Sequence, residues 1–435
     1  MKAVKLSLVI MAAALLTIGL SGMAYAFHDG GVAYCEGCHT MHNSSGGQRM
    51  YRAANQASGP QGVVGTTNQY LLQGTDQSST CLMCHSGATL SSYHVLTWPT
   101  PAAGAAPANY TPGGDFAWLS KAYTWPRGTS AGQIKGHNVV AADFGLIADT
   151  RFTSGAPGGN YPQGALGCQS CHDPHGRYRI VDASGTVALP AIGSSVLPID
   201  GSGSTGAIPT ADAAVGVYRL LGGKGYYTKS AGAAYAFSNA VDPPIAVSPS
   251  TYNRKETASD TRVAYGSGMS QWCANCHGGF HNETYPTTLR HPSGQKLTTA
   301  VIANYNAYVK SGDLTGLVGT AYTSLVPFEE GTTDRAALTT HAVFDGSQKG
   351  GADTNSVVMC LTCHRAHASA WDSSTRWNVR ATFLTEAGIY PTIADSPNEA
   401  QGRSGAEITA GMYDRPATVF ATYQRSLCNK CHVKD

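Results

Sequence analysis

The sequence CQSCHDPH, from Cys168 to His175, contains the pentapeptide C-x-x-C-H and a second histidine three residues after the first. The same pentapeptide occurs five more times, as CEGCH at 35–39, CLMCH at 81–85, CANCH at 273–277, CLTCH at 360–364 and CNKCH at 428–432. The chain has 12 cysteines. All of them belong to these motifs, so the motifs account for the whole cysteine content of the protein.

The C-x-x-C-H pattern is the attachment site of c-type haem, in which two thiols bind the porphyrin and the histidine binds the iron. A disulfide or a zinc site would explain two cysteines at this spacing, but neither explains a histidine after all six pairs. We therefore predict six covalently bound haem c groups. The predicted attachment residues are Cys35, Cys38, Cys81, Cys84, Cys168, Cys171, Cys273, Cys276, Cys360, Cys363, Cys428 and Cys431. The predicted proximal iron ligands are His39, His85, His172, His277, His364 and His432.

Nine further histidines lie outside the motifs, which is enough to give every iron a second imidazole ligand. Two imidazoles give a low reduction potential, whereas a methionine ligand would raise it. The positions of these histidines repeat along the chain. The first, third and fifth motifs are each preceded by one histidine (His28, His137, His341) and continue as C-x-x-C-H-x-x-H (His42, His175, His367). The repeat predicts one hexahaem domain, 27–435, built from three two-haem units at about 27–97, 130–290 and 335–435.

The H-x-x-H spacing indicates which iron the second histidine binds. On a helical turn, residues three apart project to the same side, but the two axial ligands of one iron approach from opposite faces of the porphyrin. The second histidine should therefore bind a neighbouring haem and hold successive haems close together. We expect distal ligation from His42, His137, His175, His341 and His367. His28, His94, His281 and His291 are the weaker candidates for any remaining position.

The composition predicts an unusual fold. Charged residues make up 13% of the 435 residues, against roughly a quarter in ordinary globular proteins. Glycine is abundant, with 51 residues, so long helices should be few and turns many. We predict a multihaem cytochrome c fold of mostly irregular coil and turn, with short helices and few strands, organised around six covalent haems.

The N-terminus has the features of a secretory signal peptide over residues 1–26. Lys2 and Lys5 precede an apolar run from Leu6 to Leu20, and Ala24-Tyr25-Ala26 is typical of a cleavage site. No later apolar stretch is long enough to span a bilayer. We therefore expect the protein to pass through the periplasm to the outside of the cell.

Charge identifies no partner. Cleavage of the signal peptide would leave 27 basic and 27 acidic residues, without a basic run of the kind that binds nucleic acid or anionic lipid.

The chain resembles the OmcS-type outer-surface hexahaem cytochromes of metal-reducing bacteria over nearly all its predicted mature length. The resemblance depends on strings that extend beyond the haem motifs. They are CEGCHTMHNS at 35–44, TPGGDFAWL at 111–119, GHNVVA at 136–141, SCHDPHG at 170–176, STYNR at 250–254, RVAYGSGMSQWCANCH at 262–277, SGDLTG at 311–316, PFEEGT at 327–332, CLTCHRAHAS at 360–369 and YQRSLCNKCH at 423–432.

The resemblance implies head-to-tail polymerisation into an extracellular filament with a continuous row of haems. It also implies that one histidine binds a haem of the adjacent protomer, and His42 is the residue at the matching position. A contact between unlike surfaces of identical subunits generates an open filament. The partners implied are a second copy of the chain, other c-type cytochromes, and extracellular metal oxides or partner cells.

Two other functions remain open from the sequence. A monomeric periplasmic electron shuttle would need the same haem chemistry. A multihaem oxidoreductase would need an iron with an open position; no motif is C-x-x-C-K, and candidate ligands outnumber irons. We therefore expect an electron-transfer protein without a dedicated catalytic site.

Overall fold

The structure is a computed structural model, and only part of the chain is described. The described residues are 38–39, 44–45, 48–49, 71–87, 94–174, 180–181, 187–188, 221–223, 225–238, 244, 246–247, 262–280, 293–342 and 350–433. The predicted signal peptide lies outside them. So do six predicted site residues: His28, Cys35, His42, His175, His281 and His291.

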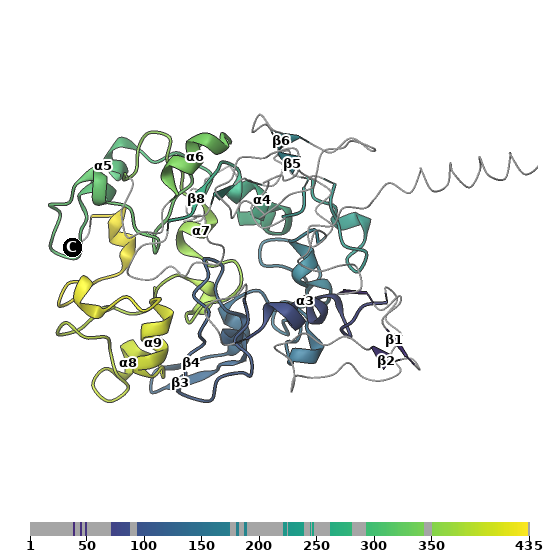
Figure 1. The fold of residues 1–435 in the computed structure, drawn as a ribbon. Coiled ribbons are helices and arrows are strands. Elements are labelled where there is room, and N and C mark those ends of the chain that lie inside the picture. The colour runs from purple at the N-terminus through teal and green to yellow at the C-terminus, as the bar shows by residue number, and fades with distance from the viewer. Residues whose placement is uncertain are drawn as a thin grey trace, which may run out of the picture.

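Short helices and turns dominate the described fold (Figure 1). The helices are α3 (Gln77–His85), α4 (Met269–His277), α5 (Thr299–Ala307), α6 (Arg335–His341), α7 (Cys360–Cys363), α8 (Pro397–Ala400) and α9 (Gly405–Gly411). Several 3-10 turns lie between them, including η6 (Cys168–Ser170), η12 (Asp372–Ser374) and η14 (Leu427–Lys430). None of these described helices exceeds nine residues.

The described strands form only two-stranded antiparallel hairpins. They pair β1 (Ser44–Ser45) with β2 (Gln48–Arg49), β3 (Tyr123–Trp125) with β4 (Gly128–Ser130), β5 (Ile180–Val181) with β6 (Val187–Ala188), and β7 (Ala246–Val247) with β8 (Ala264–Tyr265). The predicted fold of irregular coil with short helices and few strands is confirmed.

Buried apolar side chains from distant parts of the chain form one large core. It includes Leu82, Phe116, Trp371 and Leu427. Motif cysteines pack against its edge: Cys363, Cys428 and Cys431. A smaller cluster around Met269 and Leu361 has Cys171 beside it. These four cysteines therefore border the packed interior.

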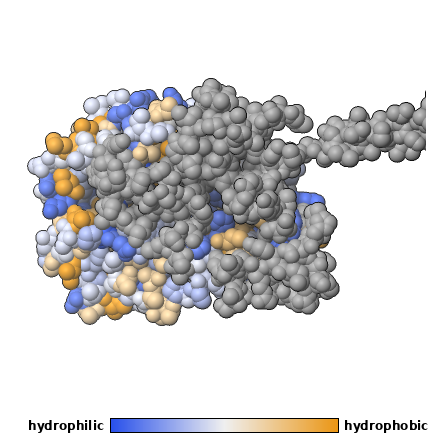
Figure 2. Space-filling view, viewed as in Figure 1, coloured by the Kyte–Doolittle hydropathy of each residue, from blue (hydrophilic) through white to orange (hydrophobic). Residues whose placement is uncertain are grey.

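The described surface has both polar and apolar regions (Figure 2). Four exposed apolar residues, Val309, Leu314, Leu317 and Val318, fall within ten positions just after α5. Exposed apolar residues gathered in this way are typical of surfaces that contact other molecules.

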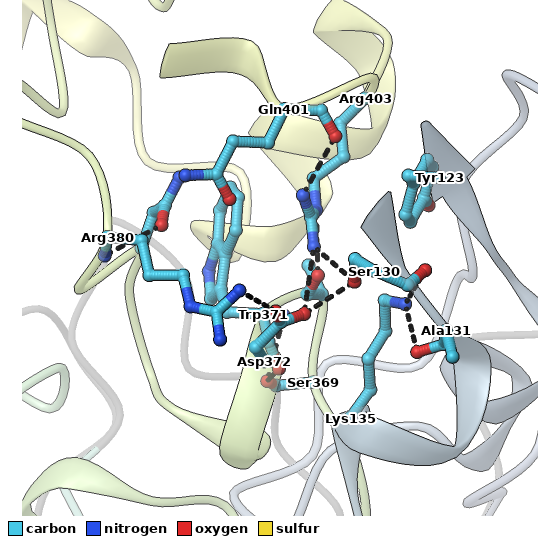
Figure 3. Close-up of polar contacts among 12 residues, drawn as sticks. Tyr123, Ser130, Ala131, Lys135, Ser369, Trp371, Asp372, Arg380, Gln401 and Arg403 are labelled. Atoms are coloured by element: carbon cyan, nitrogen blue, oxygen red, sulfur yellow. Dashed lines mark hydrogen bonds and ion pairs between the residues drawn. The ribbon is translucent and has the colours of Figure 1, made fainter. Parts of the chain in front are cut away.

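A buried polar cluster joins the β3–β4 hairpin to the C-terminal quarter (Figure 3). Arg403 is fully buried and donates to the Ala370 carbonyl at 2.8 Å and to Ser130 Oγ at 3.4 Å. Its guanidinium lies 3.8 Å from Asp372 Oδ1. Asp372 also pairs with Arg380 at 2.6 Å and accepts from the Ser130 hydroxyl. These bonds link segments far apart in sequence where few backbone pairings do so.

Candidate haem-binding sites

The third, fifth and sixth C-x-x-C-H motifs each fold as a single helical turn. In the third motif, the Cys171 N–H and the His172 N–H both donate to the Cys168 carbonyl, at 3.2 Å and 3.0 Å. The sixth motif has the same pattern, from Cys431 and His432 to Cys428, at 3.1 Å and 3.0 Å. One turn brings residues i and i+3 to the same side, so both sulfurs can reach one edge of a porphyrin.

The second and fourth motifs instead end longer helices. α3 finishes at His85 and α4 at His277. Asp76 caps α3 and accepts from the Ser79 N–H at 2.7 Å. The N-terminus of α4 is capped by the Glu329 carboxylate, which comes from a distant segment. It accepts from the N–H groups of Gly268 and Met269 at 3.3 Å and 3.2 Å.

Successive motifs are in contact with each other. The Cys168 N–H donates to Ser78 Oγ of α3 at 3.0 Å, and the neighbouring thiols raise the pKa of Cys81 and lower that of Cys168. Between the fourth and fifth motifs, the Cys360 N–H of α7 donates to Ser270 Oγ of α4 at 3.1 Å, and Cys360 raises the pKa of Cys273. These contacts join the second motif to the third and the fourth to the fifth, across the boundaries of the predicted two-haem units. The division into three units stays a prediction.

Five complete cysteine pairs are described, at the second to sixth motifs, and none of them forms a disulfide. Within the described ranges, no group of three or more His, Cys, Asp and Glu side chains could hold a metal ion. The disulfide and zinc alternatives therefore gain no support from this part of the chain.

His137 and His277 lie at a separation that would suit two ligands of one iron. Their ring centroids are 5.9 Å apart. Imidazole nitrogens bind transition metals at about 2 Å, so two rings on opposite sides of one iron would have centroids roughly 6 Å apart. His137 Nδ1 donates to the Ala366 carbonyl at 2.5 Å, and His277 Nδ1 donates to the Pro157 carbonyl at 2.7 Å. Such bonds fix the tautomer and leave Nε2 for a metal.

Desolvation, together with the neighbouring His277, lowers the pKa of His137 to about 4. The imidazole is therefore neutral at pH 7, which is the form that binds a metal. His364, the proximal histidine of the fifth motif, has the same backbone support, because its Nδ1 donates to the Ser373 carbonyl at 2.7 Å. The imidazoles of His137, His277 and His364 therefore suit haem iron as ligands.

His172 and His367 form a second pair, with ring centroids 6.4 Å apart. Phe116 stacks on the His367 ring at 4.7 Å and 26°. His172 is the proximal histidine of the third motif, and His367 follows the fifth. The geometry is that expected if the second histidine of an H-x-x-H sequence serves a different haem.

The helical turn that we expected over the H-x-x-H sequence is not formed at the fifth motif. α7 ends at Cys363, and His364 already has an extended backbone, so His364 and His367 do not share a helical turn. The chain leaves the helix and carries His367 away from His364. The separation of the two histidines comes from this extended segment.

Gly114 and Gly136 allow the segment 366–369 to pass between the backbones of residues 113–114 and 136–137. The His367 N–H donates to the Gly113 carbonyl at 2.7 Å, and the His137 N–H donates to the His367 carbonyl at 2.9 Å. A Cβ at Gly114 would lie 1.8 Å from the Ala368 carbonyl oxygen, and one at Gly136 would lie 2.2 Å from the His367 oxygen. Close backbone approach therefore brings His137 and His367 together.

The other described histidines lie apart from these two pairs. His94 is buried against Gly87, just after the second motif. His341 ends α6, with Nδ1 3.8 Å from Glu330 Oε2. His39 forms an isolated bridge with Leu72.

Sequence reasoning missed the residues that support the histidines and cysteines. Phe116, Gly113 and Gly136 lie in strings used for the family resemblance, but nothing in those strings indicated a role. The sequence does show a pattern for Ser78 and Ser270, because both stand three residues before the first cysteine of a motif.

Comparison with known proteins gives a consistent result. The chain is 53% identical to the C-type cytochrome OmcS of Geobacter sulfurreducens over the full length of both proteins. It also resembles the chain in a cryo-EM structure of OmcS nanowires from that organism, with a TM-score of 0.82 and 52% identity over 94% of this chain and all of that one. A second solved structure, the Outer Membrane Cytochrome S filament, matches with a TM-score of 0.81 and 53% identity over the same shares. No protein-family model matches. Across the described residues, no helix is both long enough and apolar enough to traverse a bilayer.

Proposed function

The chain belongs to the OmcS family of c-type cytochromes, and we propose that it carries six haem c groups through which electrons travel along an extracellular filament. It is a filament-forming cytochrome of extracellular electron transfer. The observation that carries this conclusion is 53% identity over the whole chain to OmcS, together with a TM-score of 0.82 to a chain of the OmcS nanowire.

The six C-x-x-C-H motifs supply the covalent attachment and the proximal ligands. Haem iron supplies one-electron transfer between its ferric and ferrous states. The residues of the chain hold the cofactor, fill its axial positions and bury it. Two imidazoles on each iron favour a low potential and leave no position for a substrate, which supports electron transfer over catalysis.

Geometry supports the distal ligands of two sites. His137 faces His277 and would complete the fourth haem site, and His367 faces His172 and would complete the third. His42, His175 and His341 remain the proposed distal ligands of other sites.

We propose that the filament grows head to tail, with His42 of one protomer binding a haem of the next. Export would proceed through the periplasm to the outer surface. The electrons would come from other c-type cytochromes and pass to metal oxides or partner cells.

Two measurements on the secreted protein test the function. Intact mass should equal that of the polypeptide from Phe27 plus six haems, and negative-stain microscopy should show filaments. A bare polypeptide mass would end the proposal. Particles that stay single at all concentrations would favour the periplasmic shuttle, and near-stoichiometric binding of carbon monoxide by the reduced protein would favour an oxidoreductase.

A further inference from the structure

Helices α3 and α4 share one length and one arrangement of serine, cysteines and histidine. Their sequences are QSSTCLMCH (77–85) and MSQWCANCH (269–277). Each has nine residues, ends on the proximal histidine, and has a serine at its second position, three residues before the first cysteine. These serines are Ser78 and Ser270, which are 1% and 0% exposed.

Both serine hydroxyls make the same bond to the next motif. Ser78 Oγ accepts the backbone N–H of Cys168 at 3.0 Å, and Ser270 Oγ accepts that of Cys360 at 3.1 Å. One buried hydroxyl thus holds the backbone of the following attachment site.

The thiols on the two sides of each junction influence each other: Cys168 raises the pKa of Cys81, and Cys360 raises the pKa of Cys273. The sixth motif is built differently, because the Cys428 N–H donates to Ser426 Oγ of its own turn at 3.4 Å. The serine bond between motifs is therefore a property of the second-to-third and fourth-to-fifth junctions among the described motifs.

We propose that Ser78 and Ser270 are positioning residues that set the separation of the second and third haems and of the fourth and fifth haems. The proposal rests on the proposed function, in which each motif carries a haem. A buried backbone N–H that loses its acceptor is costly, so the bond keeps the first cysteine of one motif against the helix of the previous one. Electron tunnelling falls steeply with distance, and both junctions lie on the path of the electrons.

The test uses full-length filaments of Ser78→Ala and Ser270→Ala, with Ser79→Ala as the matched control. Ser79 is a buried serine of the same helix, but its hydroxyl bonds Asp76 and Asp143 and not Cys168. Haem content by mass comes first. Iron–iron distances by cryo-EM and the Soret circular dichroism couplet between neighbouring haems are then compared with wild type.

Ser78→Ala should change the distance between the second and third irons and leave that between the fourth and fifth unchanged. Ser270→Ala should do the reverse. Each should reduce the Soret couplet and lower electron transport along the filament severalfold. Ser79→Ala should leave the distances and the couplet unchanged, since it removes a hydroxyl without touching a junction.

Gly167→Ala provides a second route to the same junction. Its new Cβ would lie 2.7 Å from Ser78 Oγ and would push the hydroxyl away from Cys168 without removing it. It should reproduce the Ser78→Ala result even if that variant fails to fold. Wild-type distances at both junctions in variants that keep six haems would overturn the proposal. A wild-type protein with fewer than six haems would contradict the proposed function instead.

Discussion

The imidazole of His367 faces that of His172 at 6.4 Å, ring centroid to ring centroid, although they belong to different haem motifs. Phe116 holds the His367 ring by stacking at 4.7 Å. The proposed place of His367 in the third haem site follows from this relationship, and the pair is directly testable.

Replacing His367 with alanine should open the third iron while the thioethers keep the haem in place. The variant should retain six haems, show a high-spin ferric signal by electron paramagnetic resonance, and bind about one carbon monoxide per chain when reduced. The wild type is the control and should bind none. A variant that stays fully low-spin and binds no carbon monoxide would show that another group ligates this iron.

The sequence predicted the chemistry of the sites better than their arrangement. The six motifs identify attachment residues because C-x-x-C-H has one dominant use. They did not indicate that His137 would lie beside the His367 segment, because that contact depends on the backbone passing Gly114 and Gly136, and such long-range approach leaves no periodic pattern. The coil-rich fold was predictable from low charge and high glycine content. The contact of the fourth motif with the fifth was missed, because the spacing of Ser270 from Cys273 does not show which distant backbone group its hydroxyl binds.

Gly114→Ala should disrupt the support of His367. The residue has φ +95°, and a Cβ would lie 1.8 Å from the Ala368 oxygen. Gly104 is the matched control, because it has φ +80° but open space around it. Gly104→Ala should cost only the strain of a left-handed residue, about 1–2 kcal/mol. Gly114→Ala should cost more in guanidinium unfolding and should produce a partial high-spin signal. Equal losses in both variants would contradict the role of close approach.

Asp372→Asn should destabilise the link between the β3–β4 hairpin and the C-terminal quarter. Arg403 is fully buried beside this carboxylate, and removal of one partner of a buried ion pair costs about 3–5 kcal/mol. Arg380→Gln is the comparison and should cost less, because the Arg380 side chain is 51% exposed whereas Arg403 is fully buried. The unfolding free energy in guanidinium measures both. Comparable small losses would show that Arg403 does not depend on Asp372.

Glu329 should make stability depend on pH. Burial raises its pKa from 4.5 to about 7, although the bonds from Gly268 and Met269 lower it. Between these two values the folded chain binds more protons than the unfolded chain, so this group's contribution to the free energy of unfolding falls as pH rises from 4.5 to 7. The full change is about 3 kcal/mol. Glu329→Gln should remove this slope, which unfolding of wild type and variant at pH 5 and pH 8 would measure. The same slope in both proteins would assign it to another group.

His42→Ala should break filaments without removing haems. The thioethers of the first motif and its proximal His39 do not depend on His42, so mass should still show six haems. If His42 binds a haem of the next protomer, its loss removes a metal bond from every junction, and a head-to-tail assembly fails at all its interfaces together. Negative-stain microscopy should show short or single particles, each with one open iron that binds carbon monoxide. Asn43→Ala, one residue further along, controls for a general disturbance of this segment. Filaments of wild-type length from His42→Ala would place the ligand of the adjacent protomer elsewhere.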